Sequence, residues 1–182
     1  NYGLGIALST FFGNATWGHG GSTIGYKSRA IYDPCRKVAV FGVANSTPSA
    51  VDGITALLYK VIVDKLPACP AAISGQQSVC QNTNGITFTV PAIANSTSYV
   101  WNLPNGVSGV SNTNSITVNF GPTAVSGTIS ASGSNGYGVG SPSTFHVTVL
   151  PTHTITENQS ICSGESIQWK GSTIFLPAQY VV

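Results

Sequence analysis

The stretch WGHGGSTIGY, residues 17–26, is the part of the sequence around which residues 1–66 are arranged. Before it, Tyr2–Ser9 alternates apolar with small residues, and this alternation predicts a strand leading into the stretch. After it, residues 22–32 are rich in Thr, Ile and Tyr, and residues 37–44 are largely apolar. With a turn at Asp33-Pro34 between the last two segments, the pattern predicts three antiparallel strands.

A helix is predicted after the third strand. Thr47 is its predicted N-cap, and Pro48 suits the first helical position. Apolar residues recur at helical spacing and predict the stripe that packs on the sheet: Val51, Ile54, Leu57, Leu58, Val61 and Ile62. Residues 1–66 therefore predict a mixed α+β fragment of antiparallel strands plus one C-terminal helix.

The distribution of charge divides the chain near residue 66. Charged residues make up only 7% of the sequence, against about 25% in a typical soluble domain, and none lies between Lys65 and Glu157. The run PACPA over residues 67–71 marks the boundary, and we expect a stiff linker at residues 67–72. The few cations make no basic patch for nucleic acid, and no run of about 18 apolar residues predicts a membrane span.

Residues 73–150 have the pattern of an all-β immunoglobulin-like sandwich. Trp101 is expected as its large core side chain, packed between the sheets. The alternating apolar segments are residues 86–90, 99–103, 116–120, 129–131 and 145–149. The absence of carboxylates from this region excludes a calcium site built on Asp or Glu side chains there. We expect no cofactor. Residues 151–182 predict a truncated β repeat, with a hairpin that includes Trp169 and Phe175.

Several short motifs in residues 1–66 match one family in order and spacing. They are Tyr2-Gly3-Leu4-Gly5, His19-Gly20-Gly21-Ser22, Gly25-Tyr26, Tyr32-Asp33-Pro34 and the apolar strand ending at Asn45. Together they resemble the last part of a beta-lactamase-related serine hydrolase, the group of class C beta-lactamases, D-Ala-D-Ala carboxypeptidases and related esterases. In that family, a strand beside the active site carries a Lys-Thr-Gly or His-x-Gly triplet.

The resemblance implies roles for four residues of the triplet region. His19 would face the active Ser, and the backbone N–H of Ser22 would be one donor of the oxyanion hole. Gly20 and Gly21 would let a small-molecule or peptide-like amide or ester substrate lie against the strand. The family's Ser-x-x-Lys and Tyr-x-Asn or Ser-x-Asn elements are missing from the sequence, so we expect this chain alone to be inactive. By residue type alone, a His beside glycines is more often an ordinary surface turn residue.

A second resemblance covers residues 69–150. It is carried by motifs such as Thr87-Phe88-Thr89-Val90-Pro91, Ser98-Tyr99-Val100-Trp101 and Ile116-Thr117-Val118-Asn119-Phe120-Gly121. These resemble PKD-like immunoglobulin-fold repeats of large bacterial surface proteins, common in Bacteroidetes. Residues 161–171 resemble the start of another repeat of such proteins. The resemblance implies a secreted or cell-surface bacterial protein whose β domain is a spacer, with cell-surface or glycan contacts as the alternative.

The remaining candidate chemistry is sparse. No Cys-x-x-Cys motif is present and the three His are not at metal-ligand spacing, so no metal site is predicted. His146 and His153 are expected to be solvent-facing strand residues. In an oxidising compartment Cys69 and Cys80 could pair, because they flank one short segment.

Two functions remain open from the sequence. The first is a fragment of an extracellular serine hydrolase acting through an acyl-enzyme, fused to PKD-like surface domains. The second is an adhesive or structural cell-surface protein in which residues 1–66 are a non-catalytic hydrolase remnant. The sequence begins without Met and ends inside a predicted strand, so in either case we expect it to be part of a longer protein.

Overall fold

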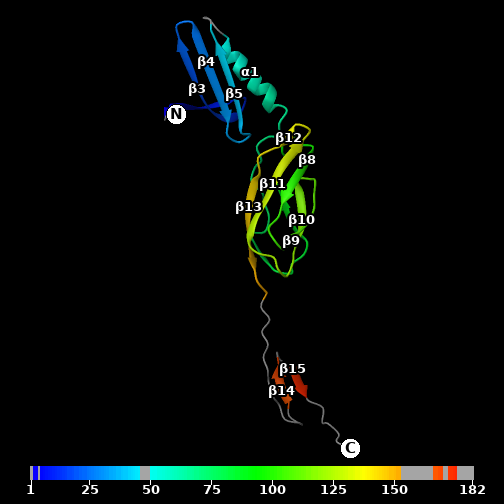
Figure 1. Ribbon diagram of the computed structural model, residues 1–182. Coiled ribbons are helices and arrows are strands. Elements are labelled where there is room, and N and C mark those ends of the chain that lie inside the picture. Colours follow the sequence, from blue (N-terminus) through cyan, green and yellow to red (C-terminus); the bar gives the residue numbers. More distant parts are fainter. Residues whose placement is uncertain (1, 4, 46–49, 153–165, 170–171, 176–182) are drawn as a thin grey trace, which may run out of the picture. The chain divides into compact units, whose positions relative to one another are not determined.

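The computed structural model describes residues 2–3, 5–45, 50–152, 166–169 and 172–175 (Figure 1). The chain separates into two compact units, Asn1–Thr152 and His153–Val182. Within the described residues the structure is mostly β, with several sheets and one short helix.

The first sheet has five antiparallel strands in the order β1-β2-β3-β4-β5. The strands are β1 (Tyr2–Gly3), β2 (Ile6–Phe11), β3 (Asn14–Thr23), β4 (Tyr26–Asp33) and β5 (Val38–Ala44). The sequence predicted three strands. The first of these is split into β1 and β2 by a turn at Gly5, whose φ of 76° lies in the left-handed region that favours glycine. The remaining additional strand is β3, which lies between the first two predicted strands. The stretch from residue 17 then spans most of β3 and the hairpin into β4.

The helix α1 (Val51–Val63) packs on β4 and β5. Its buried residues are Val51, Thr55, Tyr59 and Val63, whereas most of the predicted stripe is exposed: Ile54, Leu57, Leu58 and Val61. The predicted packing face was therefore largely wrong, because the helix has apolar residues on two faces. Gly42 leaves room under the helix for Thr55 and Val51, and the Tyr59 hydroxyl reaches an acceptor on the sheet.

The start of the helix also differs from the prediction. Ala50 is the N-cap and makes no side-chain capping hydrogen bond. Thr47, the predicted N-cap, and Pro48 lie outside the described residues. Asp52 lies in the first turn, where the helix dipole favours an anion.

Residues 78–150 form a β-sandwich. One sheet has the order β7-β10-β9, from β7 (Ile86–Thr89), β10 (Ser115–Phe120) and β9 (Val107–Ser108). The other has the order β12-β11-β13-β6, with β8 also pairing with β11. Its strands are β6 (Ser78–Cys80), β8 (Ser98–Asn102), β11 (Gly127–Asn135), β12 (Gly138–Val139) and β13 (Ser143–Leu150). All five predicted segments contribute strands, while the parallel pairing of β6 with β13 was not predicted.

The alternating inward residues of both sheets make one core. Phe88 and Phe120 are completely buried in it, and Phe145 meets Phe88 edge to face with ring centroids 5.6 Å apart. Trp101 is half-buried and packs against this core, and its indole N–H donates to the carbonyl of Thr113 at 2.9 Å. Trp101 therefore lies at the side of the core and not, as was expected for it, at its centre.

In the second unit, β14 (Ser166–Trp169) and β15 (Ser172–Phe175) pair as the predicted antiparallel hairpin. His153, Cys162 and most of the predicted truncated repeat lie outside the described residues.

Candidate functional site

The second half of β3 has one open edge. β2 pairs with β3 only from Asn14 to Gly18, whereas β4 pairs with it as far as Thr23. Among the described strands, none pairs with residues 19–23 on the side away from β4. The segment His19–Thr23 therefore carries the main-chain groups along which an extended chain could add as a further strand.

The side chains of this segment alternate between the two faces of the sheet. His19 lies opposite Ala30 and Ser22 lies opposite Lys27 in the β3–β4 register. Because successive side chains on a strand point to opposite faces, His19 and Ser22 project to different sides of the sheet. The structure therefore does not bring these two side chains together. Any joint action would use the backbone N–H of Ser22, the group that the family resemblance assigns to the oxyanion hole.

His19 lies on the face of the sheet that α1 does not cover. It lines a hollow of about 460 Å³ with apolar walls, formed with residues from β2 to β5: Ile6, Trp17, Ala30, Tyr32 and Phe41. The rings of Trp17 and Tyr32 pack with centroids 5.9 Å apart, and Phe41 is 67% exposed. A large apolar area of this kind, open to solvent, is typical of a surface that contacts another polypeptide or a ligand.

The glycines of the stretch differ in what the fold requires of them. A Cβ at Gly18 would collide with the carbonyl oxygen of Ala30, so the sheet itself requires glycine there. A Cβ at Gly20 would meet only ordinary contacts, the nearest being the Ser28 carbonyl oxygen at 3.4 Å. At Gly21 the nearest atom, 2.9 Å away, is the Ser28 hydroxyl, which can rotate aside. The two glycines assigned to substrate binding are thus not demanded by packing within the sheet.

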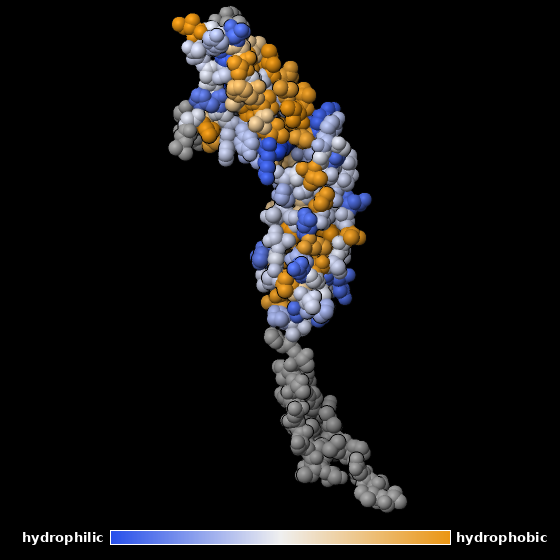
Figure 2. Space-filling model, viewed as in Figure 1, coloured by the Kyte–Doolittle hydropathy of each residue, from blue (hydrophilic) through white to orange (hydrophobic). Residues whose placement is uncertain are grey.

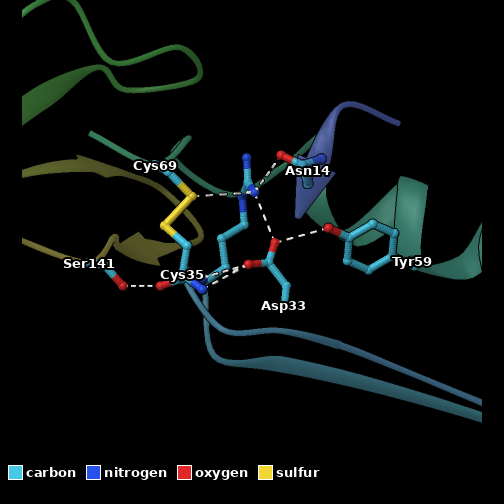
Figure 3. The surroundings of a disulfide bond; sticks show 7 residues. Asn14, Asp33, Cys35, Tyr59, Cys69 and Ser141 are labelled. Carbon is cyan, nitrogen blue, oxygen red and sulfur yellow. Dashed lines mark hydrogen bonds and ion pairs between the residues drawn. A yellow bond between two sulfur atoms is a disulfide. The ribbon is translucent and has the colours of Figure 1, made fainter. Parts of the chain in front are cut away.

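A buried charge cluster lies at the other end of the sheet (Figure 3). The Asp33 carboxylate is 1% exposed and forms an ion pair with the Arg36 guanidinium at 2.9 Å. Asp33 also accepts hydrogen bonds from the backbone N–H groups of Cys35 and Arg36, both at 3.0 Å, and from the Tyr59 hydroxyl at 2.9 Å. The second acceptor for Arg36 is the Asn14 side-chain oxygen, at 2.9 Å.

These contacts shift the pKa of two groups. Burial alone would raise the pKa of Asp33, but the hydrogen bonds from Arg36 and Tyr59 outweigh it and hold that pKa below its usual value. Burial, together with the hydrogen bond to the Asp33 carboxylate, raises the pKa of Tyr59 to about 12. Both groups are thus held in their ordinary neutral-pH forms, and the cluster ties the β4–β5 turn to α1.

The cysteines beside this cluster pair differently from the expectation. Cys35 and Cys69 form a disulfide, with Cα atoms 6.1 Å apart, whereas Cys80 is free and exposed. The expected Cys69–Cys80 pair was wrong because it rested on nearness in sequence, and the β4–β5 turn brings Cys35, 34 residues away, to Cys69. Sequence reasoning missed this junction, since the two cysteines show no motif.

Other sequence expectations concern metals, histidines and membranes. His146 is exposed on β13 opposite Thr128, as the alternation in sequence predicted. Among the described residues, no three His, Cys, Asp or Glu side chains gather to hold a metal ion. In the same part of the chain, no helix has the length and apolar character needed to cross a membrane.

The sandwich belongs to the class of immunoglobulin-like β domains, from its two packed sheets and alternating core. Comparison with family models identifies it further, because residues 66–147 match the PKD-like domain. No curated protein matches the chain. The PKD-like domain suggests a cell-surface role in adhesion or structure, and such domains are typical of extracellular proteins. The disulfide fits an oxidising compartment of this kind.

Proposed function

We propose that residues 1–66 are one wall of the acyl-transfer site of an extracellular serine hydrolase of the beta-lactamase-related type, carried on a PKD-like surface domain. The observation that carries this proposal is the open edge of β3 at His19–Thr23. The edge coincides with the segment that the family resemblance assigns to the substrate.

The chemistry that this wall offers is positioning and charge stabilisation. An acyl-enzyme mechanism needs a nucleophile with its base, donors for the developing oxyanion, and a strand that aligns the substrate. The edge of β3 aligns an amide or ester substrate, and Gly20 and Gly21 let its backbone approach closely. The Ser22 N–H donates to the oxyanion, and His19 lies on the open face toward the nucleophile. The nucleophile and its lysine belong to a part of the hydrolase outside this sequence.

Two uncovered apolar faces support the same proposal. One is the open face of the sheet around Trp17 and Phe41. The other is the outer stripe of α1, over which Figure 2 shows apolar residues gathered. On that stripe Ile54 is 64% exposed and Leu57 is 60% exposed. Soluble domains rarely leave such areas in water, so a further layer of polypeptide on each face would complete the domain.

The test is covalent labelling of the protein with its upstream coding sequence included. A fluorescent penicillin acylates the active Ser of such a hydrolase, and a fluorophosphonate phosphonylates it. We expect labelling of the longer protein, and none of the 182-residue chain. An upstream sequence with neither Ser-x-x-Lys nor Tyr-x-Asn, or no labelling when both are present, would contradict the proposal.

A matched pair of variants tests the role of the strand. Ser22→Ala keeps the backbone N–H and should label at nearly the parent rate. Ser22→Pro removes that N–H and should slow labelling by about 100-fold or more, the usual effect of losing an oxyanion donor. Circular dichroism and the melting temperature check that the Pro variant is folded. Equal labelling by the two folded variants would remove Ser22 from the site.

The second candidate is an adhesive or structural surface protein in which the hydrolase part is a remnant. It is favoured by the PKD-like domain, whose outer faces carry hydroxyl and amide groups and no charge. On the β7–β10 face, Thr87 pairs with Thr117 through their hydroxyls at 3.0 Å, and Thr89 pairs with Ser115 at 3.1 Å. Glycan-array binding by the chain, without any labelling of the longer protein, would favour this reading.

A further inference from the structure

The Cys35–Cys69 disulfide closes a loop that contains β5 and α1 entirely. Cys35 lies in the β4–β5 turn, and Cys69 follows the helix at the start of the segment that matches the PKD-like domain. A pull along the chain from the PKD-like domain therefore reaches Cys69 before it reaches the helix. From Cys69 the shortest covalent path to the first sheet runs through the two sulfur atoms.

Both ends of the disulfide are fastened to their own β-structure. On the first sheet, the buried Asp33 carboxylate accepts hydrogen bonds from the backbone N–H groups of Cys35 and Arg36. On the PKD-like side, the Ala68 N–H donates to the Ala94 carbonyl at 2.9 Å, and the Asn95 side chain donates to the Leu66 carbonyl at 3.2 Å.

Two further hydrogen bonds close the junction. The Asn135 side chain donates to the Lys65 carbonyl at 2.7 Å, and the Ser141 hydroxyl donates to the Cys35 carbonyl (Figure 3). The segments that contain the two cysteines are thus held by hydrogen bonds to the sheet and to the sandwich rather than by a free linker.

The helix inside the loop is poorly suited to bear load. Only four of its side chains are buried, and its outer stripe meets water. It also lacks a side-chain N-cap hydrogen bond, although an ion pair between Lys27 and Asp52 at 2.7 Å ties its first turn to β4. Tension applied at its C-terminal end would detach it from the sheet one turn at a time. β4, by contrast, is paired along its length on both sides, with β3 and with β5.

We propose that the Cys35–Cys69 disulfide is a force-bearing staple, which passes tension from the PKD-like domain into the β4–β5 turn and keeps α1 and β5 out of the load path. This role suits a surface protein that is pulled through its spacer domain. It does not depend on whether residues 1–66 belong to an active hydrolase, so labelling and mechanical tests can fail independently.

Single-molecule stretching of the full 182-residue chain from its two ends tests the staple. The parent for the test carries Cys80→Ser and Cys162→Ser, so that no other thiol can exchange with the staple. The staple-free partner adds Cys35→Ala and Cys69→Ala, and dithiothreitol gives the same state in the parent. Because 34 residues separate the cysteines, loss of the bond should lengthen the unfolded first segment by about 115 Å at full extension.

The force record supplies the second readout. Without the staple, we expect an early low-force release as α1 and β5 detach; with it, that release should be missing and the first sheet should open in one event at higher force. Equal lengths in both states would overturn the proposal, since the bond would be unformed or outside the load path. A longer chain with an unchanged first-event force would also overturn it, because the bond would then carry no protective role.

Discussion

The buried cluster around Asp33 allows the sharpest test of what holds the first sheet and helix together. Asp33→Asn removes the charge that Arg36 faces at 2.9 Å, and both side chains are buried, at 1% and 8% exposure. It also puts an amide N–H₂ in place of one carboxylate oxygen: Oδ2 accepts from the Arg36 and Tyr59 side chains, and Oδ1 accepts from the backbone N–H groups of Cys35 and Arg36. Breaking a buried ion pair from one side costs about 3–5 kcal/mol, because the remaining charge is left without a partner.

Amide hydrogen exchange read by mass spectrometry measures this loss locally in the intact chain. Exchange from β4 and α1 should accelerate by about 100-fold or more, since about 1.4 kcal/mol corresponds to a factor of ten. Peptides from β10 in the PKD-like sandwich serve as an internal reference and should not change. Asp33→Asn could abolish protection altogether, and Tyr59→Phe then serves as the milder variant. It removes one hydrogen bond to the carboxylate and should lower the free energy of local opening by about 1.5–3 kcal/mol.

The matched control is Asp64→Asn. Asp64 forms an ion pair with Lys60 at 2.6 Å, with both side chains largely exposed. An exposed pair of this kind contributes about 0–1 kcal/mol, because water screens it. Equal acceleration of exchange in β4 and α1 by the Asp33 and Asp64 substitutions would refute the reasoning. So would an acceleration in β10 by Asp33→Asn as large as that in β4 and α1.

Three further outcomes are expected. The raised pKa of Tyr59, about 12, means that its stabilising contribution is complete below the unfolded value of about 10 and is lost as the pH rises to about 12; tyrosinate absorbance compared with Tyr59→Phe should show this late titration, and a normal titration would contradict it. Trypsin cleavage after Lys65 should leave the two pieces joined by Cys35–Cys69, so that they separate on a gel only after reduction; separation without reductant would disprove the pair. Phe88→Ala should destabilise the sandwich by about 3–5 kcal/mol in urea unfolding, because Phe88 is completely buried; a loss below about 1 kcal/mol would contradict its place in the core.

The sandwich was largely predictable from sequence because its signal is local. Strict alternation places Phe88, Ile116 and Val118 on one face whatever the neighbours are, and all three are buried. The sequence predicted that a helix forms here, but not which of its faces packs on the sheet. Apolar side chains occur on both of its faces, and the choice between them was made by Gly42 and by the acceptor at Asp33, which come from other strands.

Some features of the candidate site were likewise predictable from sequence, and others were not. The sequence by itself determined the residue types of the stretch from Trp17 to Tyr26, the charge-free composition of the PKD-like sandwich, and the absence of a Ser-x-x-Lys motif. Only the tertiary structure decided that the pairing of β2 with β3 ends at Gly18 and leaves His19–Thr23 an open edge, and that Cys35 pairs with Cys69. Strand register and disulfide pairing join residues distant in sequence, and their free energy depends on which surfaces meet, so no local pattern encodes them.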